Sequence, residues 1–201
     1  MIRILLGSVL SALALFVFGI VSWMALGLHD GTVRQLPDQA AVTAMLREQQ
    51  LATGVYSYPM AEPAPAAPPA EQRKAMDDFI ALRREGPVFS VFYHAEGAEP
   101  FAPEVLGRGF GINFVCSLIA ATLLWMAGPS LASYGQRVLF VALLGVFAAI
   151  FRDVALFNWM TFPWDYTQAM IVDVLISWVL AGLILGAIVK RPAASSVANG
   201  R

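Results

Sequence analysis

The stretch ILLGSVLSALALFVFGIVSWMALGL, residues 4–28, contains 25 residues and no charged side chain. An α-helix needs about 20 apolar residues to cross the hydrocarbon core of a bilayer, whereas the apolar core of a signal peptide has only about 7–15. No small-x-small cleavage site ends the stretch, and Trp23 lies where an interfacial anchor is expected. We therefore predict a retained transmembrane helix over residues 4–28.

Three further apolar runs predict three further transmembrane helices. They cover residues 109–127, 138–157 and 166–189. Near the start of the last run, Asp165 and Gln168 have the spacing of a capping box. Short loops join these three runs, so the helices are expected to be successive antiparallel neighbours. The predicted fold class is an all-α membrane protein, a four-transmembrane-helix bundle.

The composition agrees with this class and excludes others. Of the 201 residues, 58% are hydrophobic and 13% are charged, whereas a soluble domain has about 25% charged residues. The net charge of −1 provides no basic face for phosphates, so no nucleic-acid partner is expected. The single cysteine, Cys116, can form neither an internal disulfide nor a cysteine-based zinc site.

A polar insert, residues 29–108, separates the first two predicted helices. Apolar residues at helical spacing, β-branched and aromatic runs, and prolines divide it into a small α+β unit. The expected order is a helix over 38–50, a strand over 55–58, a Pro/Ala-rich spacer over 61–70, a helix over 71–85 and a strand over 88–93. About 80 residues with two strands form a marginal core. The insert is therefore expected to lean on the membrane surface, on the helix ends or on a partner.

The distribution of basic residues predicts the orientation. With a cytoplasmic N-terminus, the inner segments contain five basic residues and no acid: Arg3, Arg137, Lys190, Arg191 and Arg201. The short outer loop, residues 158–165, contains no lysine or arginine. This asymmetry follows the positive-inside rule. We therefore expect a multi-pass protein of the bacterial inner membrane, with both termini and the tail 190–201 in the cytoplasm and an extracytoplasmic insert.

Charged residues within the last two runs form a predicted intramembrane polar cluster. Arg152 and Asp153 lie in the third run and Asp173 in the fourth. At about 1.5 Å per residue, Arg152 and Asp173 each lie about 9 Å below the outer edge of a hydrocarbon core of about 30 Å. Charge at this depth is costly unless it is paired or hydrated. We predict that Arg152 pairs with Asp173, leaving Asp153 to Asn113, to water or to Arg108.

Two interpretations of this cluster remain open. Asn113 and Ser177 are placed to join it, which would form a polar pocket able to bind a proton or a head group. Alternatively, the cluster is a structural salt bridge near the interface, with the long arginine side chain reaching toward water.

Other candidate ligands are His29, His94 and Trp178. The two histidines fall in the insert, where a bis-imidazole pair could ligate haem, but neither has metal-ligand spacing, so we expect exposed or interfacial histidines. Trp178 falls near the middle of the membrane, where it either fills the bundle core or contacts a quinone or lipid. No metal and no cofactor is predicted.

Several short stretches resemble uncharacterised bacterial four-helix inner-membrane proteins of about 200 residues. They are SWMALGLH (22–29), LPD (36–38), GVY (54–56), SYGQRVLF (133–140), NW (158–159) and FPWDY (162–166). The resemblance covers most of the chain and implies a bacterial four-helix protein. It brings no activity and no catalytic residues, and the Arg152-Asp153 pair is not part of it.

No motif of a P-loop, a serine hydrolase or a zinc protease is present in the sequence. We therefore expect a non-enzymatic accessory, assembly or interaction subunit of an inner-membrane complex, with the lipid bilayer and other membrane or periplasmic proteins as partners. The alternative is a small transporter or ligand-binding protein that uses the intramembrane cluster for a proton, a lipid or a quinone.

Overall fold

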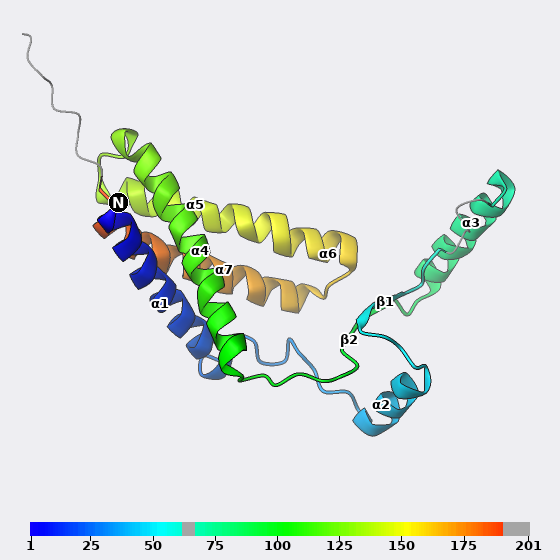
Figure 1. The fold of residues 1–201 in the computed structure, drawn as a ribbon. Helices are drawn as coiled ribbons and strands as arrows, with labels where there is room; N and C mark the ends of the chain where they lie inside the picture. The colour runs from blue at the N-terminus through cyan, green and yellow to red at the C-terminus, as the bar shows by residue number, and fades with distance from the viewer. Residues whose placement is uncertain (62–66, 191–201) are drawn as a thin grey trace, which may run out of the picture. The chain divides into compact units, whose positions relative to one another are not determined.

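The computed structural model describes residues 1–61 and 67–190. These residues form two compact units, one comprising residues 1–34 with the chain from Pro100 onward, and the other residues 35–99 (Figure 1). Residues 62–66, half of the predicted spacer 61–70, and all of the tail except Lys190 lie outside the described residues.

The first unit contains four helical segments that are long and apolar enough to cross a membrane, as predicted. They are α1 (Ile2–Met24), the segment Pro103–Ser130 that includes α4 (Pro103–Ala127), the segment Tyr134–Met160, and α7 (Trp164–Ile188). The segment Tyr134–Met160 consists of α5 (Tyr134–Ala149), a π-helical turn (Ile150–Val154) and α6 (Ala155–Met160).

The helix starts differ from those predicted, for reasons of capping. Helix α4 begins six residues before the predicted 109, because Pro103 suits the first helical position and Glu104 favours the positive end of the helix dipole. Helix α5 begins after a complete capping box formed by Ser133 and Gln136. The capping box predicted for α7 is wrong. Pro163 is the N-cap there and no side chain caps the helix, while Asp165 accepts hydrogen bonds from the Tyr166 amide and from Arg34.

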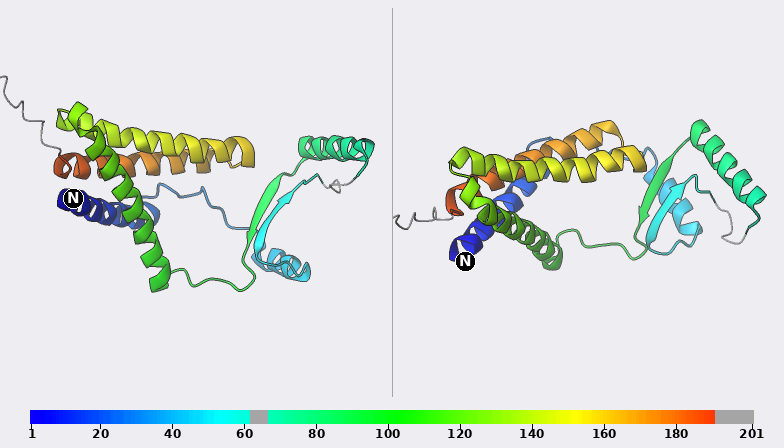
Figure 2. Two further views of the ribbon diagram at one scale, coloured as in Figure 1. Left: turned by 45° about the horizontal axis from the view of Figure 1, so that its top comes forward. Right: turned by 90° about the horizontal axis from the view of Figure 1, so that it is seen from above.

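Small residues bring α5 and α7 into close contact along their length (Figure 2). Gly145 on α5 faces Trp178 on α7, and Gly182 on α7 faces the backbone of Val138 on α5. Arg137 strengthens the contact by donating from Nε to the Gly186 carbonyl oxygen at 2.9 Å. Glycine lets two helix backbones approach closely, which is the common mode of helix association in membranes.

Helix α1 packs against both α4 and α7. Ser117 of α4 donates a hydrogen bond to Ser11 of α1 at 3.1 Å, and both side chains are fully buried. Apolar side chains from α1, α4, α5 and α7 form the core: Leu15, Ala120, Ala121, Leu124, Val141, Ala181, Leu185 and Val189. The buried hydroxyls satisfy each other, as buried polar groups must in a region without water.

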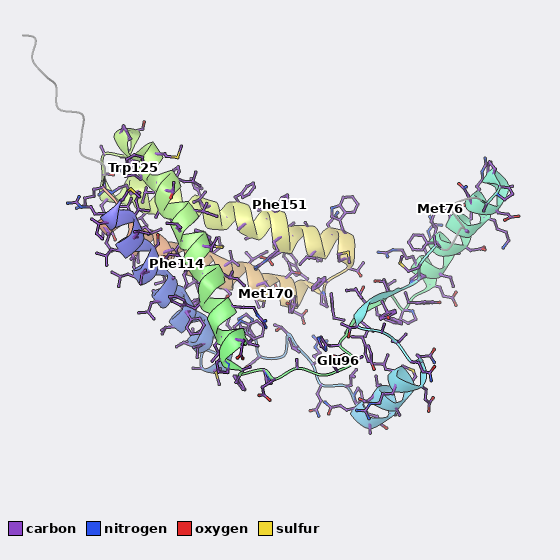
Figure 3. All side chains as sticks on the ribbon, viewed as in Figure 1. Met76, Glu96, Phe114, Trp125, Phe151 and Met170 are labelled. Carbon is purple, nitrogen blue, oxygen red and sulfur yellow. The ribbon has the colours of Figure 1, made fainter. Side chains whose placement is uncertain are left out.

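The outer faces of the four helices are apolar and uncovered within the described residues. Each of the four segments contains an apolar stretch of 18 residues, and only 22–28% of the residues in that stretch are buried. Phe151, for example, is 74% exposed and stacks on Phe147, and its side chain points away from α7 (Figure 3). Apolar surface on all sides of a bundle is typical of contact with lipid.

The second unit confirms the predicted order of elements. It contains α2 (Gln39–Glu48), β1 (Gly54–Tyr58), α3 (Pro69–Glu85) and β2 (Phe89–Tyr93). Strands β1 and β2 pair antiparallel with Val55 opposite Phe92, Ser57 opposite Ser90 and Tyr58 opposite Phe89. Asp38 caps α2 by accepting a hydrogen bond from the Ala41 amide at 2.9 Å.

Candidate functional site

The chain turns back immediately after α1 and places His29 against the end of that helix. Gly27 supplies the turn with a φ of +64°, in the left-handed region that glycine adopts without strain. The amide of Asp30 then donates to the Gly27 carbonyl oxygen at 3.1 Å. The His29 ring stacks on the indole of Trp23, with a centroid separation of 3.9 Å and an interplanar angle of 9°.

His29 is therefore buried, so of the two expected states, exposed or interfacial, the exposed one is wrong for this residue. Its exposed fraction is only 7%, whereas Trp23 is 52% exposed and covers one face of the imidazole. The reason is local, because the glycine turn returns the chain onto the helix instead of leading it away. A salt bridge holds the same segment, because Arg34 Nη2 lies 2.6 Å from Oδ2 of Asp165 at the start of α7.

His29 meets Asp173 of α7 and Ser22 of α1. Its Nε2 atom lies 3.5 Å from Asp173 Oδ1 and 3.2 Å from Ser22 Oγ. The Ser22 hydroxyl also donates a short hydrogen bond to Asp173 Oδ1. Ser22 is fully buried and the Asp173 side chain is 20% exposed, so this contact joins α1, the segment after it and α7 in a largely dry place.

The hydrogen bonds fix the roles of the three groups. The Ser22 proton goes to Asp173, so the serine oxygen is left as an acceptor for a proton on Nε2 of His29. Nδ1 of His29 is buried and has no hydrogen-bond partner among the described residues. It is therefore the buried side-chain atom of the site that can still accept a hydrogen bond.

This arrangement is not a nucleophilic triad, although it contains serine, histidine and aspartate. In such a triad the aspartate holds one imidazole nitrogen and the serine gives its proton to the other. Here both Ser22 and Asp173 approach the same nitrogen of His29, and the serine is inaccessible. The site can hold and share a proton, but it has no activated hydroxyl.

Arg152 and Asp153 pair with each other, and the predicted pair of Arg152 with Asp173 is wrong. The arginine Nε and Nη2 atoms donate to the two carboxylate oxygens of Asp153 at 2.8 and 3.1 Å. Both residues lie in the π-helical turn Ile150–Val154, which departs from the 100° spacing that would separate neighbours on an α-helix. Asp153 is 4% exposed and its two oxygens are both used, so Asn113 and Arg108 are not its partners.

The other predicted site residues form no hydrogen bond or ion pair with Ser22, His29 or Asp173. Asn113 and Ser177 are half-buried, and within the described chain neither side chain forms a hydrogen bond. Trp178 packs against the apolar core and faces Gly145. His94 is exposed in the unit 35–99. Among residues 1–61 and 67–190, no three histidine, cysteine or acidic side chains are grouped as a metal site would require.

The sequence identifies Asp173 and His29 as candidates, but it does not indicate their contact, the part played by Ser22 or the stacking of Trp23. The available signal is the order Ser22-Trp23-x-x-x-Gly27-x-His29, polar and aromatic residues at the end of an apolar run followed by a glycine. That order permits a turn back onto the helix.

Comparisons with protein-family models, with curated proteins and with solved structures found no match for this chain.

Proposed function

We propose that this chain is a non-enzymatic integral protein of the bacterial inner membrane, an accessory or assembly subunit whose insert, residues 35–99, contacts another protein. One observation carries the proposal: among the described residues of this 65-residue unit, Pro59 alone is buried. A unit of this size normally needs a core, a metal, disulfides or a partner to be stable. The described residues of the insert form no core, and its sequence contains no cysteine for a disulfide, so a partner surface is the stabilising element that we infer.

The two-stranded sheet of β1 and β2 presents the apolar surface that a partner would cover. Val55 and Phe92 are cross-strand partners and are 59% and 68% exposed, so they form one continuous apolar face. Met60 adds to the exposed apolar area at the end of β1 with 62% exposure. Aromatic side chains of this kind are enriched at the centres of protein interfaces.

The orientation is part of the same proposal. The basic residues of the short segments gather at one end of the four helices, and the positive-inside rule assigns that end to the cytoplasm. The insert then lies on the opposite side of the membrane, in the periplasm of a bacterium with two membranes. Its partner is accordingly the outer part of another membrane protein or a periplasmic protein.

Site-specific crosslinking in intact membranes tests the proposal. A photoreactive amino acid replacing Phe92 should give one predominant crosslinked product, whereas the same group replacing Lys74 on the polar surface of α3 should give little. Phe92→Ser should reduce co-purification of that product in mild detergent, and Lys74→Ser should not. Equal crosslinking from both positions, or products formed only with lipid, would contradict the proposal.

A second candidate, a small proton-binding transporter or ligand-binding protein, is favoured by the contact of His29 with Asp173. The specific observation is a buried imidazole whose Nε2 atom lies beside the Asp173 carboxylate and whose Nδ1 atom has no hydrogen-bond partner among the described residues. Because His29 stacks on Trp23, an ion or ligand that binds at this contact should change the Trp23 fluorescence. His29→Gln should abolish this change, and Trp23→Phe should remove its signal.

Asp173→Asn separates the two candidates. The asparagine keeps the shape and a hydrogen-bond acceptor for Ser22 but removes the charge. A transporter or ligand-binding protein should lose the fluorescence response to its ion or ligand with this substitution. An accessory subunit should keep the Phe92 crosslink at full yield.

A further inference from the structure

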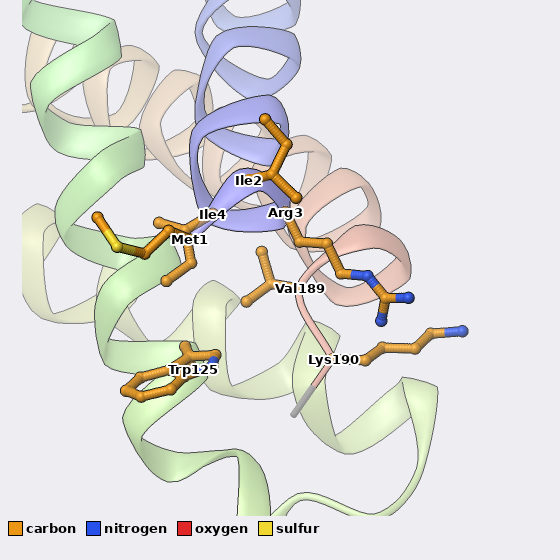
Figure 4. Close-up of a pocket in the computed structure, with 7 residues that line it drawn as sticks. All are labelled: Met1, Ile2, Arg3, Ile4, Trp125, Val189 and Lys190. Carbon is orange, nitrogen blue, oxygen red and sulfur yellow. The ribbon is translucent and has the colours of Figure 1, made fainter. Parts of the chain in front are cut away.

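An open pocket of about 320 Å³ lies at the end of the bundle where α1 begins and α7 ends (Figure 4). Its wall comes from three parts of the chain that are distant in sequence: Met1, Ile2, Arg3 and Ile4 at the start of α1, Trp125 near the end of α4, and Val189 with Lys190 after α7. This pocket is distinct from the contact of His29 with Asp173, which lies at the opposite ends of α1 and α7.

The pocket combines an apolar floor with two cations. Val189 is 2% exposed and Ile4 is half-buried, so the floor is fixed apolar surface. Arg3 and Lys190 are exposed at the rim, and their side chains extend toward the same side of the pocket (Figure 4). Trp125, 39% exposed on the other side, is a residue type that prefers the level of lipid head groups.

Within the part of the chain that the structure describes, neither cation has an acidic partner. The side chains of Arg3 and Lys190 form no hydrogen bond or salt bridge with the described residues. Arg137, near the same end of the bundle, differs because it donates to three backbone carbonyl oxygens and is fully engaged. No aspartate or glutamate occurs in residues 1–29, 105–152 or 174–190, which include every residue that lines the pocket.

We propose that this pocket binds an anionic phospholipid of the surrounding leaflet, with the phosphate between Arg3 and Lys190 and the first part of an acyl chain on Ile4 and Val189. Three properties match that ligand: positive charge without a protein counter-ion, an apolar floor, and a place at the end of the membrane spans. Basic pockets between transmembrane helices bind anionic head groups in this way. The bound lipid joins α1 to the end of α7, since each helix contributes one cation.

Lipid titration of the purified, delipidated protein measures the proposed selectivity. Phosphatidylglycerol and phosphatidylcholine with identical acyl chains are added separately, and native mass spectrometry counts the bound lipid. A basic residue near a membrane surface contributes about fivefold in affinity for an anionic lipid, so wild type should prefer phosphatidylglycerol by roughly thirtyfold. Absence of this preference in wild type would overturn the proposal.

Variants locate the selectivity. Arg3→Gln and Lys190→Gln should each weaken phosphatidylglycerol binding by about fivefold, and the double variant should bind both lipids alike. The double variant Lys74→Gln with Arg84→Gln removes one lysine and one arginine from the insert and should retain the wild-type preference. If this control loses the preference equally, net charge rather than the pocket selects the lipid, and the proposal fails.

Two further measurements distinguish a phospholipid site from a loss of folding and from a free-anion site. The charge-retaining double variant Arg3→Lys with Lys190→Arg should keep the preference, and both double variants should unfold at the wild-type temperature without anionic lipid, because neither side chain is packed. Inorganic phosphate at the same concentration should not displace the lipid. Full displacement by inorganic phosphate would identify a free-anion site and overturn the assignment to a phospholipid.

Discussion

Replacing Gly145 by alanine tests the packing on which the whole bundle depends. A Cβ atom at this position would lie 2.3 Å from Cβ of Trp178, 2.6 Å from its Cγ and 2.9 Å from its Cδ1. Carbon atoms in contact are normally about 3.5–4.0 Å apart. The nearest atom, Trp178 Cβ, is attached directly to the α7 backbone, so no change of side-chain rotamer relieves the clash. Helices α5 and α7 must separate by about 1 Å or more.

The expected cost follows from two opposing contributions. Overpacking of a close contact costs about 1–3 kcal/mol, and an immovable neighbour places this site at the upper end of that range. Alanine is a better helix former than glycine by about 1 kcal/mol, which offsets part of the cost. The net destabilisation should be about 2 kcal/mol, corresponding to a fall in the unfolding temperature of roughly 4–8 °C for a chain of this length.

The assay is thermal unfolding of the purified protein in one mild detergent, followed by circular dichroism. Gly111→Ala is the matched control, because a Cβ atom there meets nothing within 4 Å and the position lies inside α4. That substitution should leave stability unchanged or raise it by up to about 1 kcal/mol. If the two variants change the unfolding temperature by the same amount and in the same direction, the close contact of α5 with α7 is refuted.

Three other substitutions test local features of the bundle. Ser133→Ala removes the capping box of α5 and should cost about 1 kcal/mol in the free energy of unfolding, measured by the same thermal assay; no loss would show that the cap is unimportant. Asp173→Leu should release His29 from the bundle, so that diethyl pyrocarbonate modifies the imidazole faster than in wild type; an unchanged rate would mean that Trp23 alone holds it. Arg152→Gln leaves the buried Asp153 carboxylate unpaired and should cost about 1–3 kcal/mol, whereas a neutral effect would indicate that water already solvates that carboxylate.

The four spans could be predicted because each one is a long run of apolar residues with few charged side chains. An uncharged apolar run as long as residues 4–28 is best accommodated across a membrane. The observed ends of the helices differ from the predicted ends by only a few residues, because capping residues extend the helices beyond the apolar runs. The order of helices and strands in the insert could also be predicted, because prolines and Gly54 mark where these elements begin or end. The start of α4 was missed by six residues because the polar first turn of that helix, from Pro103 to Arg108, does not look like membrane helix.

The pairing of charges could not be predicted from spacing in a regular helix. Regular α-helical spacing places Arg152 at the depth of Asp173. In the structure both Arg152 and Asp153 lie in a π-helical turn, and the arginine side chain donates hydrogen bonds to Asp153. No short sequence pattern specifies such a turn. The position of His29 depended in the same way on one backbone angle, the positive φ of Gly27, which the sequence permits without requiring.

The polar side chains of the bundle differ in whether they have a hydrogen-bond partner within the chain. Ser8 donates to the Ile4 carbonyl oxygen, Ser11 accepts from Ser117, and Asp153 is held by Arg152, so each of these groups has its partner within the chain. In a region without water an unsatisfied polar atom costs several kcal/mol, and such atoms are accordingly rare. Nδ1 of His29 is the one buried side-chain atom of the described residues left in that state. In this bundle that nitrogen is therefore the buried acceptor to which a hydrogen-bond donor could still bind.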